Sequence, residues 1–214
     1  MQRAILFLIA LILSIAVHEY GHALVASRLG DPLPRSQGRL TLNPLRHADL
    51  MGTIVFPLVA MFSSFPLLGW GKPVQTNTAA YTRRFSRATG HMFVAIAGPA
   101  MNLVLMVVSS LVMVVLVRVG VASNSLLLVV EEHLIRLNFV LMVFNLLPIP
   151  PLDGGAVLAW FLPPSLQGIV DFLQRWGMLV LLGLMFTGLL SLWFTPAFHL
   201  YDYWLRLIHG LLAA

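Results

Sequence analysis

Residues 4–22 read AILFLIALILSIAVHEYGH, an apolar run that ends in two histidines and a glutamate. A run of this length predicts a helix that is embedded in a membrane. Residues four apart on a helix differ by about 40° in azimuth, so His18 and His22 lie on one face, one turn apart. Both imidazoles can then reach one zinc ion, and Glu19 is placed to take a proton from water at that metal. Three ionisable groups in one turn are costly in lipid, which favours a functional site over two incidental histidines.

The composition is that of a chain solvated mainly by lipid. Of its 214 residues, 59% are hydrophobic and only 10% are charged, too few to cover the surface of a soluble domain. The net charge is +5, but the cations are scattered between apolar tracts, which favours contact with anionic headgroups over nucleic acid. The chain has no cysteine, so any metal must be held by histidines and carboxylates.

Apolar tracts predict an all-α polytopic membrane protein. The tracts are residues 4–26, 50–70, 92–117, 134–149 and 178–194. A weaker sixth tract, residues 198–212, carries an aspartate, an arginine and a histidine, and suggests an amphipathic helix at the membrane interface. We expect a bundle of about four to six transmembrane helices. We also expect one membrane-embedded domain over residues 1–214, with a core over residues 4–160 and C-terminal helices over residues 165–212.

The positions of the cations predict how the chain is oriented in the membrane. Residues 28–49 and 71–90 hold eight of the thirteen lysines and arginines. The positive-inside rule places both loops in the cytoplasm. The tract between them, residues 50–70, must then enter and leave the membrane on the same side, and its prolines and glycines suit such a re-entrant segment.

A third metal ligand is suggested by the stretch NLLPIPPLDGG, residues 145–155. Its three prolines break the helix just before Asp153, and the two glycines that follow permit unusual backbone and close approach. Breaking a membrane helix around one carboxylate is costly unless it builds a site. Asp31 and Asp49 flank a cytoplasmic loop, and the glutamates at 131 and 132 fall at the opposite face of the membrane, so Asp153 is the candidate.

The re-entrant segment and the metal ligands lead to the same topology. Asp153 can meet His18 and His22 only if the first and fourth tracts end on the same side of the membrane. If residues 50–70 crossed once, Asp153 would lie on the wrong face. If they are re-entrant, the three ligands can converge.

Together these motifs resemble the site-2 protease family of intramembrane metalloproteases, in particular its short bacterial members without a PDZ domain. HEYGH at 18–22, GPAMN at 98–102 and NLLPIPPLDG at 145–154 carry the likeness. NPLRHADLMGT at 43–53 and GWGKPV at 69–74 also resemble segments of that family. The motifs occur in the expected order and membrane setting, over about residues 10–160.

The resemblance implies a zinc endopeptidase that cuts membrane proteins in or next to their transmembrane segments. His18, His22 and Asp153 would ligate one zinc ion per chain, and Glu19 would act as general base and acid. The protein would be integral to a bacterial inner membrane, with its active site towards the cytoplasm. Nothing in the sequence specifies an oligomer or names a substrate.

Two side-chain amides also acquire roles through the resemblance. Asn102 and Asn145 would help to hold the substrate or its oxyanion near the metal. An amide inside a membrane span must find hydrogen-bond partners, so interhelical structural bonds are an equally good explanation for both.

Residues 39–42 alternate in polarity and could form a small β element at the membrane edge, to which an extended substrate would add by backbone pairing.

Three other functions fit part of the sequence. A different membrane zinc peptidase could share the histidine motif but use another third ligand. A membrane transporter could bind a metal cation in transit through buried histidines and carboxylates, although the chain shows no inverted repeat. A proteolytically inactive metal-binding protein is the third, and the intact catalytic positions argue against it.

Overall fold

The computed structural model describes residues 2–62, 71–82 and 84–213, and within these residues every regular element is a helix. Three long helices come first: α1 (Gln2–Arg28), α4 (Arg87–Arg118) and α5 (Leu126–Asn145). At the C-terminal end follow α6 (Asp153–Phe161), α7 (Gln167–Phe186) and α8 (Leu190–Ala213). The short elements are α2 (Leu33–Ser36), η1 (Pro44–Arg46), η2 (Leu50–Val55), α3 (Phe56–Phe62), η3 (Thr78–Ala80) and η4 (Pro164–Leu166).

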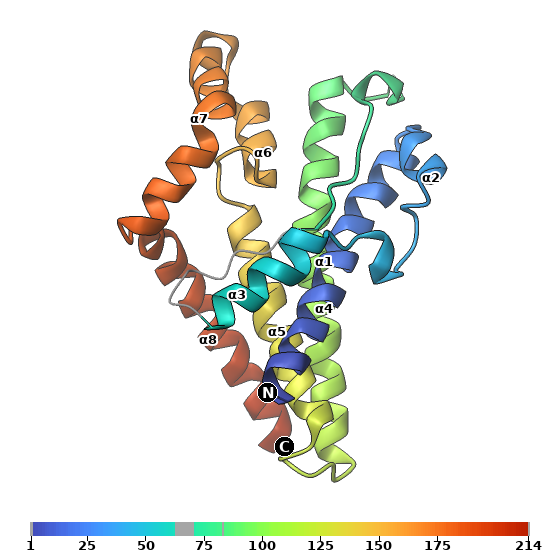
Figure 1. Ribbon diagram of the computed structural model, residues 1–214, viewed down its shortest axis with the longest axis vertical. Helices are drawn as coiled ribbons and strands as arrows, with labels where there is room; N and C mark the ends of the chain where they lie inside the picture. The colour runs from blue at the N-terminus through green and yellow to red at the C-terminus, as the bar shows by residue number, and fades with distance from the viewer. Residues whose placement is uncertain (1, 63–70, 83, 214) are drawn as a thin grey trace.

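The helices form a central bundle with a second arm beside it (Figure 1). α1 and α5 run in one direction and α4 runs in the other, so α1 and α5 end on the same side of the bundle. α6 and α7 make the second arm, and α8 returns alongside α5 towards the end where both termini lie. The loops around α2 and before α4 lie at the opposite end. This is the topology that the convergence of the three metal ligands requires.

The bundle core is formed by apolar faces of the long helices. Ala10, Leu11 and Ile15 of α1 pack against Leu134 and Leu137 of α5. A second cluster joins α4, α5 and α8 through Met106, Phe139 and the aromatic side chains of α8. Because α8 also donates hydrogen bonds from two tryptophan indoles, to the carbonyl oxygen of Val143 and the hydroxyl of Ser110, it is fixed along α4 and α5.

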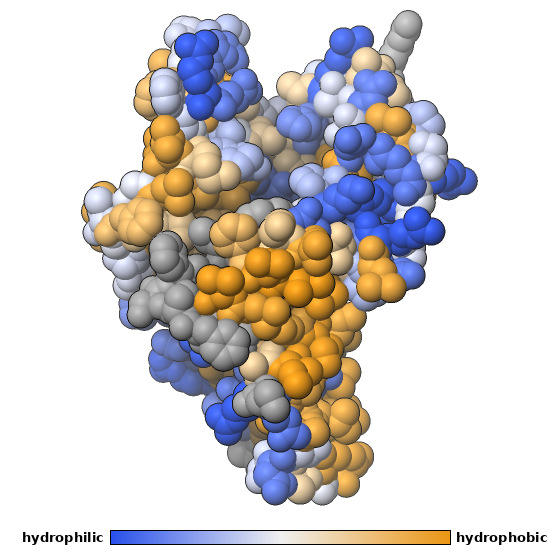
Figure 2. All heavy atoms as spheres, viewed as in Figure 1, coloured by the Kyte–Doolittle hydropathy of each residue, from blue (hydrophilic) through white to orange (hydrophobic). Residues whose placement is uncertain are grey.

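The outer surface is apolar over much of its height. Hydrophobic side chains form a broad band across the middle of the molecule, and hydrophilic ones gather at the upper ends of both arms (Figure 2). Among the described residues, three helices are long and apolar enough to cross a membrane, namely Gln2–Arg28, Arg87–Arg118 and Pro164–Phe186. The chain is therefore an all-helical integral membrane protein, while the number of crossings stays a prediction.

Two of the apolar tracts correspond to helices with different bounds. The tract 178–194 is not one helix, because the chain turns at Gly188, which has a φ of +73°. α5 begins at Leu126, eight residues before the apolar tract 134–149, because Ser125 caps it by accepting a hydrogen bond from the Leu127 amide. Hydropathy missed both boundaries. The turn lies between apolar residues, and the polar residues at 131–133 separate the apolar first turns of α5 from the tract 134–149.

A buried histidine ties together the two loops that flank the tract 50–70. His47 is fully buried, its ring bonds the Thr41 carbonyl oxygen at 2.8 Å, and its own carbonyl accepts the Lys72 amide at 2.8 Å. The Arg39 guanidinium donates to the carbonyl oxygens of Arg46 and Lys72. Burial lowers the pKa of His47, so the ring is neutral near pH 7. The residues just before and just after the tract 50–70 therefore lie side by side at one end of the molecule. Residues 63–70 of the predicted re-entrant segment lie outside the described residues.

The predicted edge strand at residues 39–42 is not present. These residues form an irregular loop in which the Arg39 amide donates to the Pro34 carbonyl oxygen, a bond that closes the turn after α2. No strand occurs anywhere in the described part of the chain. Residues 71–77, which pass the candidate site, have no regular secondary structure.

Packing between the two arms predicts opposite effects for two glycines of α7. A Cβ at Gly177 would overlap the carbonyl oxygen of Pro150, whereas a Cβ at Gly183 would meet nothing within 4 Å. We expect Gly177→Ala to lower the midpoint of thermal unfolding in detergent by several degrees, because overpacking costs about 1–3 kcal/mol. Gly183→Ala is the matched control and should leave the midpoint equal or higher, since alanine favours a helix by about 0.5–1 kcal/mol. Equal midpoints for both variants would contradict the packing of α7 on this turn.

Candidate active site

The two histidines of α1 lie on the face that packs against α4. His18 and His22 are one turn apart, and their Nε2 atoms lie 3.1 Å from each other. Gly98 of α4 makes room for both rings, because a Cβ there would overlap His22 Nε2 and lie 2.7 Å from His18 Cε1. One turn towards the N-terminus of α4, the Val94 carbonyl oxygen lies 2.7 Å from His22 Nδ1.

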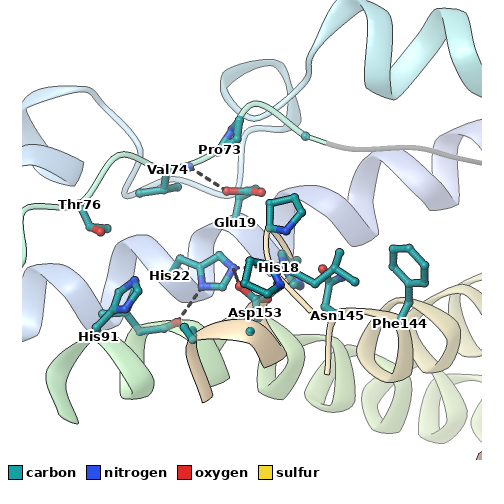
Figure 3. A pocket seen from close by; sticks show the side chains of 18 of the residues that line it. His18, Glu19, His22, Pro73, Val74, Thr76, His91, Phe144, Asn145 and Asp153 are labelled. Carbon is teal, nitrogen blue, oxygen red and sulfur yellow. Dashed lines mark hydrogen bonds and ion pairs between the residues drawn. The ribbon is translucent and has the colours of Figure 1, made fainter. Parts of the chain in front are cut away.

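Asp153 joins the histidines from the second arm (Figure 3). It is the first residue of α6, directly after the proline-rich turn that ends α5. Its Oδ2 lies 3.3 Å from His18 Nε2, and its Oδ1 lies 3.4 Å from His22 Nε2. One potential ligand atom from each of the three side chains lies within 4.8 Å of the other two. The structure thus brings together the three residues that the sequence suggested as metal ligands.

The hydrogen bonds of the two imidazole rings leave their Nε2 atoms suited to bind a cation. His18 Nδ1 lies 2.5 Å from Asn102 Oδ1, and His22 Nδ1 bonds a backbone carbonyl, so each Nδ1 carries a proton and donates it. A ring that carries its only proton on Nδ1 keeps a lone pair on Nε2, the atom that faces the other ring. Asp153 Oδ2 is buried and receives no hydrogen bond from the described residues. Two nitrogen lone pairs and a carboxylate in one dry space repel one another without a cation, and they form the kind of donor set that zinc prefers.

Glu19 lies beside this cluster but points to a different partner. Its Oε2 accepts a hydrogen bond of 3.0 Å from the Val74 amide, in the segment 71–77 (Figure 3). The side chain is 8% exposed. Gly71 lets this segment run close to α1, because a Cβ there would lie 2.5 Å from the Ile15 side chain and 3.4 Å from Glu19 Cγ. Glu19 is therefore held near the cluster without being one of the three converging groups.

A cavity of about 680 Å³ opens onto the cluster. Its wall is built from α1, the segment 71–76, the first turns of α4, the end of α5, and the α6–α7 arm. It includes His18, Glu19, Val74, His91, Asn145 and Asp153. The cavity lies between the central bundle and the α6–α7 arm, since residues of both line it.

The two asparagines suggested by the family resemblance occupy different places. Asn145 lines the cavity and donates from its Nδ2 to the Leu141 carbonyl oxygen at 2.9 Å. Asn102 is fully buried behind His18 and does not line the cavity. Its position favours a role in supporting His18 over direct contact with a substrate.

Sequence reasoning missed several residues that shape the site. Asn138 and Ser14 are buried polar side chains behind His18, and Val74 is the hydrogen-bond partner of Glu19. Two signals were available, since Ser14 precedes His18 by one helical turn and Asn138 is an amide in an apolar tract. For Val74 there was no signal, because its amide and not its side chain makes the contact.

The chain belongs to peptidase family M50, whose model matches residues 6–184. This confirms the assignment to the site-2 proteases that the motifs suggested. One relative is "Putative zinc metalloprotease YwhC" of Bacillus subtilis (strain 168), 37% identical over 85% of this chain and 80% of that protein.

Two further relatives are both named "Putative zinc metalloprotease Rip2". The one from Mycolicibacterium smegmatis (strain ATCC 700084 / mc(2)155) is 33% identical over 89% of this chain and 70% of that protein. The one from Mycobacterium tuberculosis (strain ATCC 25618 / H37Rv) is 31% identical over 86% and 67% of the two chains. No solved structure matches the chain at a significant level.

The space left by Gly98 predicts a variant that loses the metal without losing a ligand. In Gly98→Ala the new methyl group must displace the His22 ring, so we expect bound zinc to fall well below one per chain. Metal analysis of the purified protein measures this. Ala100→Val adds more volume at an exposed position of the same helix and should keep its zinc. Full zinc content in Gly98→Ala would contradict the placement of the two rings against α4.

Proposed function

We propose that this chain is a zinc endopeptidase that hydrolyses peptide bonds in or next to the transmembrane segments of other membrane proteins. The observation that carries the proposal is the convergence of two imidazoles and a carboxylate, with Glu19 beside them, on one cavity in an apolar bundle. Membership of peptidase family M50 and relatives named as zinc metalloproteases support it.

His18, His22 and Asp153 are the proposed ligands of one zinc ion. When bound, zinc lowers the pKa of water and polarises a peptide carbonyl, which are the two effects that hydrolysis of an amide needs. The ligands come from both arms, two from α1 and one from the start of α6. The prolines before Asp153 and Gly98 on α4 serve to bring them together.

Glu19 is the proposed general base and acid. Its carboxylate lies in the cavity wall next to the ligands and is not itself one of the converging groups. It takes a proton from the attacking water as the new C–O bond forms at the scissile carbonyl. It then donates that proton to the amide nitrogen as the C–N bond breaks, so that an amine leaves.

Asn145 and the segment 71–77 are proposed to hold the substrate. The Asn145 side-chain amide has two N–H groups, of which one donates to Leu141 within its own helix, and the other would donate to a substrate carbonyl. Pro73, Val74 and Thr76 line the cavity in a segment that is neither helix nor strand. A substrate unwound into an extended strand would pair with this segment, which reads the backbone and permits loose sequence preference.

The membrane topology is proposed from charge and from one backbone bond. Lys72 donates to the His47 carbonyl oxygen, which supports a segment 50–70 that enters and leaves on one side. The cation-rich loops on either side of it favour the cytoplasmic face for the active site. The relatives are bacterial proteins, which supports a bacterial inner membrane.

The decisive test separates the proposed base from the proposed ligands. We expect Glu19→Gln to lower cleavage of single-span model substrates in detergent by about 10²–10⁴-fold, because the amide cannot accept the proton. Metal analysis of the same preparation should still find about one zinc per chain, because Glu19 is not a ligand. Asp153→Ala should lose both cleavage and zinc.

Glu132→Gln is the matched control, an identical change at an exposed position of α5, and should cleave like the wild type. Wild-type cleavage by Glu19→Gln would overturn the assignment of the base. Zinc bound by the wild type with no cleavage of any model substrate would contradict proteolysis and point to transport or metal binding instead.

The absence of cysteine allows a direct test of orientation. Ser36→Cys lies at the end of α2, in the region between α1 and η1, and Ser123→Cys lies in the loop between α4 and α5. Both positions are exposed. With the charge rule, a membrane-impermeant maleimide added to intact cells should label Cys at 123 and spare Cys at 36. Labelling in the reverse order would place the active site on the outer face.

A further inference from the structure

A chain of hydrogen bonds runs behind His18 through the centre of the bundle. Asn102 of α4 accepts from His18 Nδ1 with its Oδ1 and donates from its Nδ2 to Asn138 Oδ1 of α5 at 2.7 Å. Asn138 Nδ2 donates to Ser14 Oγ of α1 at 2.8 Å, and Ser14 donates to the Ala10 carbonyl oxygen at 2.7 Å. This series of hydrogen bonds therefore starts on α1, crosses α4 and α5, and returns to α1 one turn before His18.

These polar groups are sealed from solvent. Ser14, Asn102 and Asn138 each have 0% of their surface exposed. In so dry a setting an amide that loses its hydrogen-bond partners is destabilising, because no water replaces them. Each amide in the chain is therefore strongly held in the one orientation that satisfies all of its groups.

That orientation is fixed at its far end by a backbone carbonyl. Asn138 Nδ2 also donates to the Leu134 carbonyl oxygen at 2.8 Å. A carbonyl can only accept, so Asn138 must keep its nitrogen towards Leu134 and its oxygen towards Asn102. Asn102 must then turn its own nitrogen to Asn138 and its oxygen to His18. Facing an acceptor, His18 must carry its proton on Nδ1, which leaves the Nε2 lone pair for a metal.

We infer that Asn138 is a positioning residue for the metal centre: acting through Asn102, it selects the His18 tautomer whose Nε2 can bind zinc. The inference rests on the proposed function, in which His18 is a zinc ligand. It adds a residue that touches neither metal nor cavity and lies on a helix that supplies none of the ligands. His22 has no need of such a chain, because its Nδ1 bonds a backbone carbonyl directly.

The test compares variants that differ in whether they keep an acceptor for Asn102. Asn138→Leu has a similar volume but accepts nothing, so Asn102 Nδ2 keeps only its longer bond of 3.4 Å to the Ser14 carbonyl oxygen, and the amide is freer to reverse and present its nitrogen to His18. We expect the zinc dissociation constant of Asn138→Leu to rise about 10–100-fold. Asn138→Asp retains an acceptor oxygen and should bind zinc close to the wild type. Ser14→Ala removes only the last side chain of the hydrogen-bond series, and its zinc dissociation constant should lie between those of Asn138→Asp and Asn138→Leu.

A second measurement detects the tautomer itself in the metal-free protein. ¹⁵N chemical shifts of the imidazole nitrogens distinguish a proton on Nδ1 from one on Nε2, and the His18 signals are assigned by their loss in His18→Gln. We expect Nδ1–H in the wild type and in Asn138→Asp, and a mixture containing Nε2–H in Asn138→Leu. A residue with a purely structural role would change stability without moving these signals.

Ser110→Ala is the control for the loss of a buried polar group, since Ser110 is fully buried on α4 and bonds Met106 and Trp204. It should lower stability and leave zinc affinity and the His18 tautomer unchanged. Unchanged affinity and tautomer in Asn138→Leu would overturn the inference. If Asn138→Leu does not fold, the two other variants decide. Wild-type zinc affinity in Ser14→Ala together with weakened zinc binding in Asn138→Asp would then overturn the inference. Failure of the wild type to bind zinc would instead overturn the proposed function, so the two outcomes are distinct.

Discussion

The close approach of α1 to α4 is the constraint on which the rest of the structure depends. Gly21 faces the Ala97 carbonyl oxygen and Gly98 faces the two imidazole rings, so each helix lacks a side chain where the other needs space. Small residues at such contacts are the usual means of packing helices in a membrane, where no hydrophobic effect drives them together. Here the contact also sets the position of the histidines. A larger residue at either glycine would therefore change packing and chemistry at once.

A second constraint is the need to satisfy polar groups inside an apolar bundle. The structure meets it in two ways, with backbone carbonyls for His22 and with a relay of side chains for His18. Glu19 is satisfied by a backbone amide of the loop that passes over it. α4 and α5 supply none of the proposed metal ligands, but they supply hydrogen-bond partners for the polar side chains of the site. The partners for the two Nδ1 atoms leave the Nε2 atoms of His18 and His22 facing the proposed metal site.

Much of the site was visible in the sequence because its residues obey local rules. The spacing of His18 and His22 depends only on helical geometry, and the prolines before Asp153 mark a helix end whatever surrounds it. The direction of α5 followed from charge and from the need for the ligands to meet. By contrast, the link between Asn102 and Asn138 depends on how two helices are rotated against each other, which a single sequence does not encode locally. The turn at Gly188 was hidden for a related reason, since the residues on both sides of it are equally apolar.

The position of Asp153 on the second arm also affects how the molecule holds together. Outside the site, α6 packs on α4, where the Trp160 indole donates to the Thr89 hydroxyl at 3.1 Å, and Gly177 of α7 lies against the turn at Pro150. A metal bound by His18, His22 and Asp153 links the N-terminal helix to a residue far along a chain that has no disulfide. It acts as a cross-link that closes a long loop and restricts the unfolded chain, which is the entropic contribution that a disulfide makes in secreted proteins. The ion proposed for catalysis would thus also hold the α6–α7 arm to the central bundle.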